Sequence, residues 1–318
     1  MNNIEDFLFK KALEGNNLLK LMEVPKADVH SHCLLGMRFA TFNKMFGGEV
    51  PTPPKKMDGL YGFDEYIFKK LAKYISHSEQ LEQLLEATIL EAINDGVKIL
   101  ETSVDTNWLL LYPSYDDCFS AIKNIQDKYS NQIDFRPELG IVKSLTVERM
   151  DNVLSECIDS GIFKSLDLYG DESIDDFERF KDYFIYAKSK GLKLKAHAGE
   201  FSGSENVRKA IEILDLDEVQ HGIAIYNDDY SLDLVKERGI RLNICPSSNL
   251  ILGAVNDLKS HPIKTLFDKG ILLSINTDDL LVFNQSVSEE FLKLYQHNVL
   301  GVEELNEIRK TPLNLSST

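Results

Sequence analysis

The sequence predicts an α/β protein built as a (β/α)8 TIM barrel with an insertion after the first strand. Three observations favour this fold: eight short apolar runs, stretches of helical period between them, and a length of 318 residues, which one large barrel can occupy. From the second run onward, the spacing is about one strand plus one helix, which favours eight βα units over a doubly wound sheet. The predicted strands are 27–32, 97–103, 133–141, 163–168, 192–197, 218–221, 240–245 and 271–276.

The segments between these runs have the apolar periodicity of helices. In Ser78–Asn94, apolar residues recur every three or four positions, and Gly96 follows as a stop signal. The same joint, in which a glycine ends a helix and an apolar strand follows, recurs three times later in the chain. We therefore predict further helices at 175–190, 231–238 and 263–269.

The longest gap separates the first two predicted strands. Within it, Arg38–Tyr61 contains three prolines together with Phe39, Phe42 and Phe46. This segment is predicted to be an insertion above the barrel mouth, where its phenylalanines either form a lid that excludes water or anchor the loop. No linker, low-complexity tract or tandem repeat interrupts the sequence, so residues 1–318 are predicted to form one domain.

The composition excludes several classes of partner. The chain has 35 Lys and Arg against 51 Asp and Glu, a net charge of −16, which disfavours binding to nucleic acid or to an anionic membrane. No run approaches the roughly 18 apolar residues that a membrane helix needs, and the first thirty residues lack the apolar segment of a signal peptide. With four scattered cysteines and no CxxC pair, the sequence predicts a cytoplasmic protein. It leaves the oligomeric state open.

Polar residues gather where the predicted strands end, and in a barrel this is the end that carries the active site. His30 and His32 end the first strand, and strand alternation places both imidazoles on one face. Three imidazoles and one carboxylate suit a single zinc ion, or another divalent transition metal. The remaining groups then supply acid–base chemistry. The strand-end set is His30, His32, His197, Glu200, His221, Asp278 and Asp279, whereas His77, His261 and His297 fall in helical or loop segments and are assigned surface or structural places.

Together with these histidines, the motifs SLDLYGDE (165–172), HAGE (197–200), QHG (220–222), CPSSN (245–249) and NTDD (276–279) resemble the adenosine deaminase family of the metal-dependent amidohydrolase superfamily. The resemblance covers the chain from about Pro25 to Asp279. It implies hydrolytic deamination of a 6-aminopurine nucleoside, adenosine or deoxyadenosine, by a metal-bound hydroxide, with inosine or deoxyinosine and ammonia as products.

The resemblance also implies a role for each matching residue. His30, His32, His197 and Asp278 match the zinc ligands. Glu200 matches the residue that protonates the purine at N1, and His221 matches the histidine that orients and helps to activate the water. Asp279 matches the carboxylate that hydrogen-bonds N7, and Gly170 matches the backbone amide that meets N3.

Three departures from the family pattern concern substrate fit. The run after His32 is Cys33-Leu34-Leu35-Gly36, without the polar side chain that the family uses for a sugar or ring substituent. Gln220 stands where the family has glycine, and Leu280 stands where it has proline. Adenine, a modified adenosine and an N6-substituted adenine nucleotide therefore remain alternative substrates.

Two other functions remain as alternatives: a non-catalytic metal-binding barrel, and a hydrolase of the same superfamily acting on a non-purine amide or ester. Glu200, His221 and Asp279 argue against the first, and the purine-facing positions of Gly170 and Asp279 argue against the second. The predicted partner is a small-molecule purine. The strong negative charge favours an uncharged nucleoside or base over a nucleotide, unless a local cation such as Arg38 intervenes.

Overall fold

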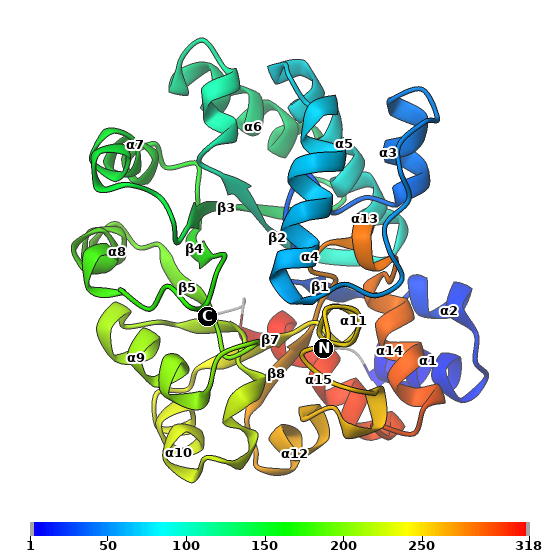
Figure 1. Ribbon diagram of the computed structural model, residues 1–318. Coiled ribbons are helices and arrows are strands. Elements are labelled where there is room, and N and C mark those ends of the chain that lie inside the picture. The colour runs from blue at the N-terminus through cyan, green and yellow to red at the C-terminus, as the bar shows by residue number, and fades with distance from the viewer. Residues whose placement is uncertain (1–2, 316–318) are drawn as a thin grey trace.

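A computed structural model describes residues 3–315 and has eight parallel strands in the sequential order β1 to β8 (Figure 1). All eight predicted strands are confirmed, with ends shifted by a few residues. Their bounds are β1 Lys26–Asp28, β2 Val97–Asp105, β3 Asp134–Val142, β4 Ser165–Tyr169, β5 Lys193–Ala198, β6 Glu218–His221, β7 Arg241–Ile244 and β8 Leu272–Ile275. Together with the surrounding helices they form the predicted (β/α)8 barrel.

The barrel closes through residues just beyond β1 and β8. Ser31 forms a parallel bridge with Asp278, the Asp278 N–H donates to the His30 carbonyl at 3.0 Å, and the His32 N–H donates to the Asp278 carbonyl at 3.3 Å. The prediction of a continuous first strand to His32 is wrong, since β1 ends at Asp28. Beyond it the chain divides its pairing: Ser31 bridges to Asp278 on one side, while His32 bridges to Ser103 of β2 on the other.

Helices surround the strands, and most match the predicted positions. The predicted helix Ser78–Asn94 is confirmed as α5, and the predictions at 231–238 and 263–269 correspond to α10 and α12. The other α-helices that cover the barrel or flank its ends are α1 Asn3–Glu14, α2 Leu18–Met22, α6 Tyr115–Tyr129, α7 Val147–Asp159, α8 Lys181–Ser189, α9 Ser204–Leu214, α10 Asp229–Glu237, α11 Pro246–Ile251, α12 Ile263–Asp268, α13 Leu280–Phe283, α14 Val287–Gln296 and α15 Val302–Leu315.

The prediction of one helix over 175–190 is wrong in its first half. A 3-10 helix covers Glu178–Phe180, and only Lys181–Ser189 is α-helical. Residues 174–177 have no regular secondary structure and follow a turn at 172–173, where the Asp171 carboxylate accepts the Ser173 N–H at 2.8 Å and Glu172 binds the loop after β5. The segment before α8 is therefore not α-helical where Glu172 supports the loop at the barrel mouth.

The insertion after β1 contains α3 (Phe39–Met45) and α4 (Gly59–Tyr66), joined by the proline-rich segment. Phe42 is fully buried, and its ring lies 4.6 Å from that of Phe46, so these two phenylalanines anchor the insertion. Two backbone bonds fasten it to α11: Met57 N–H donates to the Ile251 carbonyl at 2.9 Å, and Gly59 N–H donates to the Leu252 carbonyl at 3.1 Å. That the insertion acts as a lid stays a prediction.

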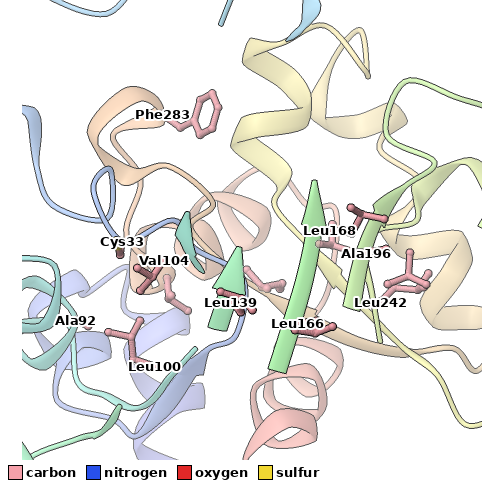
Figure 2. Packing of buried hydrophobic residues seen from close by; sticks show 14 of the residues in the cluster. Cys33, Ala92, Leu100, Val104, Leu139, Leu166, Leu168, Ala196, Leu242 and Phe283 are labelled. Carbon is pink, nitrogen blue, oxygen red and sulfur yellow. The ribbon is translucent and has the colours of Figure 1, made fainter. Parts of the chain in front are cut away.

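The main hydrophobic core lies between the strands and the helices. Leu166 and Leu168 of β4, Leu139 of β3, Ala196 of β5 and Leu242 of β7 belong to one buried cluster (Figure 2). Because side chains alternate along a strand, the intervening residues face the barrel interior.

The interior is polar at mid-height. Lys195 of β5 is fully buried and forms ion pairs with Glu101 of β2, with Glu138 of β3 at 2.6 Å and with Glu218 of β6 at 3.4 Å. Arg241 of β7 adds a bond to Glu218 at 2.6 Å. We call these five residues the lower layer. Its central residue, Lys195, comes two residues before His197 on β5, and therefore lies one level further from the C-terminal end of the barrel. Among residues 3–315, no helix is long and apolar enough to cross a membrane.

Candidate active site

The structure brings the four predicted metal ligands together at the C-terminal end of the barrel. Donor nitrogens of His30, His32 and His197 lie within 4.8 Å of one another. Asp278 Oδ1 lies 3.6 Å from His30 Nε2 and 3.4 Å from His32 Nε2. The four side chains come from the β1 extension, from β5 and from the loop after β8, so barrel closure assembles the cluster.

His30 is held with a fixed nitrogen facing the cluster. Its Nδ1 lies 3.0 Å from the Asn243 carbonyl, to which it donates, so Nε2 has a free lone pair for an ion. Cys245 Sγ also lies 3.3 Å from this Nδ1. Such a partner behind a ligating histidine orients its ring toward the ion.

The chemistry of this cluster fits a divalent metal ion. His30 Nε2 and His197 Nε2 are buried and have no hydrogen-bond partner within the described part of the chain. Buried polar atoms without partners are costly, and a metal ion would satisfy both nitrogens. Burial disfavours the charged form of Asp278, but His32, His30 and His221 outweigh burial and hold the pKa of Asp278 well below its usual range. Three imidazoles beside an ionised carboxylate form a donor set that suits zinc, which binds imidazole in its neutral form.

Glu200 and His221 face each other beside this cluster. His221 Nε2 lies 3.4 Å from Glu200 Oε2 and 3.9 Å from Asp278 Oδ2. The Asn249 side chain contacts both Glu200 and His221: its Nδ2 lies 2.6 Å from Glu200 Oε1 and 3.2 Å from His221 Nδ1. Both His221, with φ of 64°, and Asp278, with φ of 58°, have left-handed backbones.

Burial raises the pKa of two carboxyl groups of the site. Burial, followed by the charges of Asp278 and Glu172, raises the pKa of Glu200 well above its usual range. Burial also raises the pKa of Asp279 well above its usual range, against the opposing effect of His32. Asp279 Oδ1 is buried without a hydrogen-bond partner in residues 3–315. Burial therefore favours the form in which each group can donate a proton.

Gly170 follows β4 beside this cluster. Its φ is +103°, and an added Cβ would lie 3.2 Å from Val142 Cγ2, so a side chain would be strained there. The preceding residue, Tyr169, places its ring 5.0 Å from that of His32.

Several buried residues support the site although the sequence analysis gave them no role. Asp167 Oδ1 lies 3.5 Å from His197 Nε2, and the Lys143 ammonium donates to the His197 carbonyl at 2.9 Å. The Glu172 carboxylate accepts three consecutive N–H groups, from Glu200 at 3.0 Å, Phe201 at 3.0 Å and Ser202 at 2.7 Å. Strand alternation through 165–169 indicates that Asp167 faces inward, but the partners of Lys143 and Glu172 lie on other strands and give no local sequence signal.

The fold and the site together define a class, the barrel hydrolases that carry a His and Asp metal cluster at the C-terminal end of the sheet. Comparison with known proteins narrows this class. The family model for adenosine deaminase matches residues 138–317. A protein from Treponema pallidum named as a putative adenosine/adenine deaminase is 37% identical over 271 residues, which are 85% of this chain and 91% of that protein. The chain belongs to the adenosine deaminase family.

Solved structures share the fold at lower identity. The adenine deaminase from Arthrobacter aurescens superposes with a TM-score of 0.81 at 19% identity, covering 91% of this chain and 93% of that one. An amidohydrolase from Burkholderia ambifaria, solved with bound zinc, also superposes with a TM-score of 0.81, at 20% identity. This match covers 94% of this chain and 87% of that one. These likenesses show that the chain shares the barrel fold of these proteins.

Proposed function

We propose that this protein is a zinc-dependent aminohydrolase that converts a 6-aminopurine, adenosine or deoxyadenosine first among the candidates, into the 6-oxopurine and ammonia. The whole chain serves this reaction as one catalytic domain. The observation that carries the proposal is the position of two carboxyl groups, Glu200 and Asp279, beside a cluster of side chains that could hold a metal ion, with burial raising the pKa of both.

This pair matches the chemistry of a purine ring. The carbon that bears the amino group lies between N1 and the five-membered ring with N7, and both nitrogens are hydrogen-bond acceptors. Two buried acids can therefore donate on both sides of the carbon under attack, Glu200 toward N1 and Asp279 toward N7. A pyrimidine offers no second acceptor of this kind, and an amide or ester offers neither, so a two-donor site favours a purine.

His30, His32, His197 and Asp278 would hold the metal ion. When bound, such an ion lowers the pKa of water and supplies hydroxide near neutral pH. Glu200 would give its proton to N1 when hydroxide adds to the neighbouring carbon. The added hydroxyl would then pass its proton, through the Glu200 carboxylate, to the amino group, which leaves as ammonia while the carbonyl forms. His221, beside Glu200 and Asp278, orients the attacking oxygen, and the Gly170 N–H meets N3. Zinc is the preferred ion because the site offers three imidazoles and one carboxylate. Another divalent transition metal is the alternative.

The charges near the insertion favour an uncharged substrate. The cation considered for a phosphate, Arg38, is neutralised by Glu91 and Glu289, each at 2.9 Å. A guanidinium held between two carboxylates attracts a phosphate weakly. A nucleoside or a free base therefore fits better than a nucleotide, and adenine is the second candidate.

The test is ammonia release from the zinc-loaded protein with adenosine, deoxyadenosine, adenine, methylthioadenosine and adenosine monophosphate. We expect turnover of a nucleoside or of adenine, and little or none of the monophosphate. If every 6-aminopurine is inert while the metal is bound, the proposal is wrong. If only the monophosphate reacts, the reaction class stands and the substrate assignment fails.

Elemental analysis of the purified chain provides a second test. We expect close to one transition-metal ion per chain, lost together with activity when any of His30, His32, His197 or Asp278 is replaced. A fully active protein without metal would contradict the proposal.

A further inference from the structure

One buried histidine, His261, takes no part in the proposed reaction. It lies between the 3-10 helix Leu258–Ser260 and α12, and it is only 3% exposed. Its Nδ1 accepts the Ile263 N–H at 3.0 Å, and its Nε2 lies 3.1 Å from Asn249 Oδ1. Both ring nitrogens are therefore engaged, although the sequence analysis assigned this residue a surface or structural place.

The Ile263 N–H fixes the proton of this histidine. A backbone N–H can only donate, so Nδ1 of His261 must be the unprotonated nitrogen. The single proton of the neutral ring then lies on Nε2 and is donated to Asn249 Oδ1. A charged ring is excluded because its Nδ1 proton would point at the Ile263 N–H, and burial lowers the pKa of His261 to about 4.

The orientation of the Asn249 amide follows from the same bond. Its oxygen accepts from His261, so the nitrogen must face Glu200 and His221. The amide has two hydrogens and meets two acceptors, Glu200 Oε1 at 2.6 Å and His221 Nδ1 at 3.2 Å. A reversed amide would place its NH2 group against a protonated His261 nitrogen, which is a donor against a donor.

The protons at the site are placed by this chain of bonds. Since His221 Nδ1 accepts from Asn249, the proton of neutral His221 lies on Nε2, the nitrogen that faces Glu200 Oε2 and Asp278. Since Glu200 Oε1 accepts from Asn249, Oε2 is the oxygen that holds the proton whenever Glu200 is protonated. Both protons are thereby directed toward the space between Glu200, His221 and Asp278.

We propose that His261 is a positioning residue which, through Asn249, fixes the protons of His221 and Glu200 on the atoms that face the substrate. This inference rests on the proposed function for the identity of the two target groups. It further implies that His221 presents an N–H to the attacking oxygen and acts as a hydrogen-bond donor. A histidine that only filled space at position 261 would leave the tautomer of His221 unchanged when replaced.

The direct test is the 15N spectrum of the zinc-loaded full-length protein labelled at histidine, with signals assigned by single replacement. In the wild type we expect His261 and His221 to be neutral at pH 7, each protonated on Nε2. A charged His261, or a proton on Nδ1 of either ring, would overturn the proposal without any variant. This measurement does not depend on turnover, so it remains decisive even if the 6-aminopurine screen fails.

Two variants separate positioning from packing. His261→Leu fills the space without a donor, and we expect kcat to fall about 10- to 100-fold, as for other partners behind a catalytic group. KM should change by no more than about threefold, and the His221 signal should become a mixture of tautomers. His261→Gln keeps an N–H that can reach Asn249 and should recover most of the lost kcat.

His297→Leu is the matched control, because His297 is exposed at the end of α14 and bonds only the Lys293 carbonyl at 2.8 Å. It should leave kcat and the His221 signal unchanged. If His261→Leu folds, binds one metal ion and keeps both the wild-type kcat and the wild-type His221 tautomer, the proposal fails. If His261→Leu does not fold, the wild-type spectrum and the His261→Gln variant still decide the matter.

Discussion

Two polar layers occupy the barrel interior, one directly above the other, and they differ in how far their groups are satisfied by the protein. In the lower layer, each ionisable side chain contacts an opposite charge, with Lys195 at the centre of Glu101, Glu138 and Glu218. In the upper layer, which contains the candidate site, His30 Nε2, His197 Nε2 and Asp279 Oδ1 find no hydrogen-bond partner in residues 3–315. Glu138 Oε2 of the lower layer also lacks a hydrogen-bond partner in residues 3–315, but Glu138 Oε1 is paired with Lys195. The difference is therefore that charges of the lower layer are paired within the fold, whereas the two imidazole nitrogens of the upper layer are left for a ligand.

The largest effect should come from removing the metal ion. A chelator should abolish ammonia release, because no side chain of the upper layer can replace the ion as the source of hydroxide. The lower layer needs no ligand, so circular dichroism should still report a folded barrel. Readdition of zinc should restore activity, and unfolding on chelation would contradict the division of roles between the layers.

The next largest effect concerns the proton donor. Glu200→Gln should lower kcat about 10²- to 10⁴-fold, because the amide cannot protonate the ring. Metal content and thermal stability should stay close to the wild type. Activity measured with the best substrate of the screen checks the loss, and a variant with undiminished kcat would remove Glu200 from the mechanism.

A change in the lower layer should instead act on stability. Lys195→Met leaves Glu138 buried without its cation and leaves Glu101 with Arg136 at 3.2 Å, and breaking a buried pair costs about 3–5 kcal/mol. Urea unfolding of the metal-loaded protein measures this loss. Lys193→Met is the control on the same strand: Lys193 is 42% exposed and contacts Glu218 at 3.1 Å, so its loss should cost about 1 kcal/mol or less. Equal losses for both variants would contradict a structural role for the buried layer.

A smaller effect on turnover should follow from loosening the loop that contains Glu200. In Glu172→Gln, an NH2 group replaces one of the two oxygens that accept the N–H groups of residues 200–202. We expect kcat to fall about 10- to 100-fold with the metal retained. Hydrogen exchange of the 200–202 amides should accelerate in parallel.

Asp171→Asn provides the control, because it removes the same charge one residue away, where the carboxylate accepts the N–H of Ser173. This variant should keep most of the activity. If it lowers kcat as strongly as Glu172→Gln, the effect is one of charge alone.

Sequence patterns predicted the barrel and most of the upper layer for a physical reason. Strands alternate with period two, and a barrel collects its strand ends at one face, so His197 and Asp278 could be placed without knowing their partners. The end of β1 was mispredicted because its backbone groups bond distant residues, Ser103 and Asp278. The segment before α8 was mispredicted because short local bonds, such as that from the Ser173 N–H to the Asp171 carboxylate, replace a helical turn. The chain from His261 through Asn249 to Glu200 was missed for the same reason, since its bonds join three separate segments.

The left-handed backbones at His221 and Asp278 have a consequence for the evolution of this chain. A side chain in that conformation costs about 1–2 kcal/mol, a cost that glycine avoids and asparagine reduces. Fold stability and catalysis therefore favour different residues at the same two positions. Selection for thermal stability alone should therefore replace His221 and Asp278 by glycine or asparagine, and turnover should be lost. The most stable form of this barrel is then not its active form.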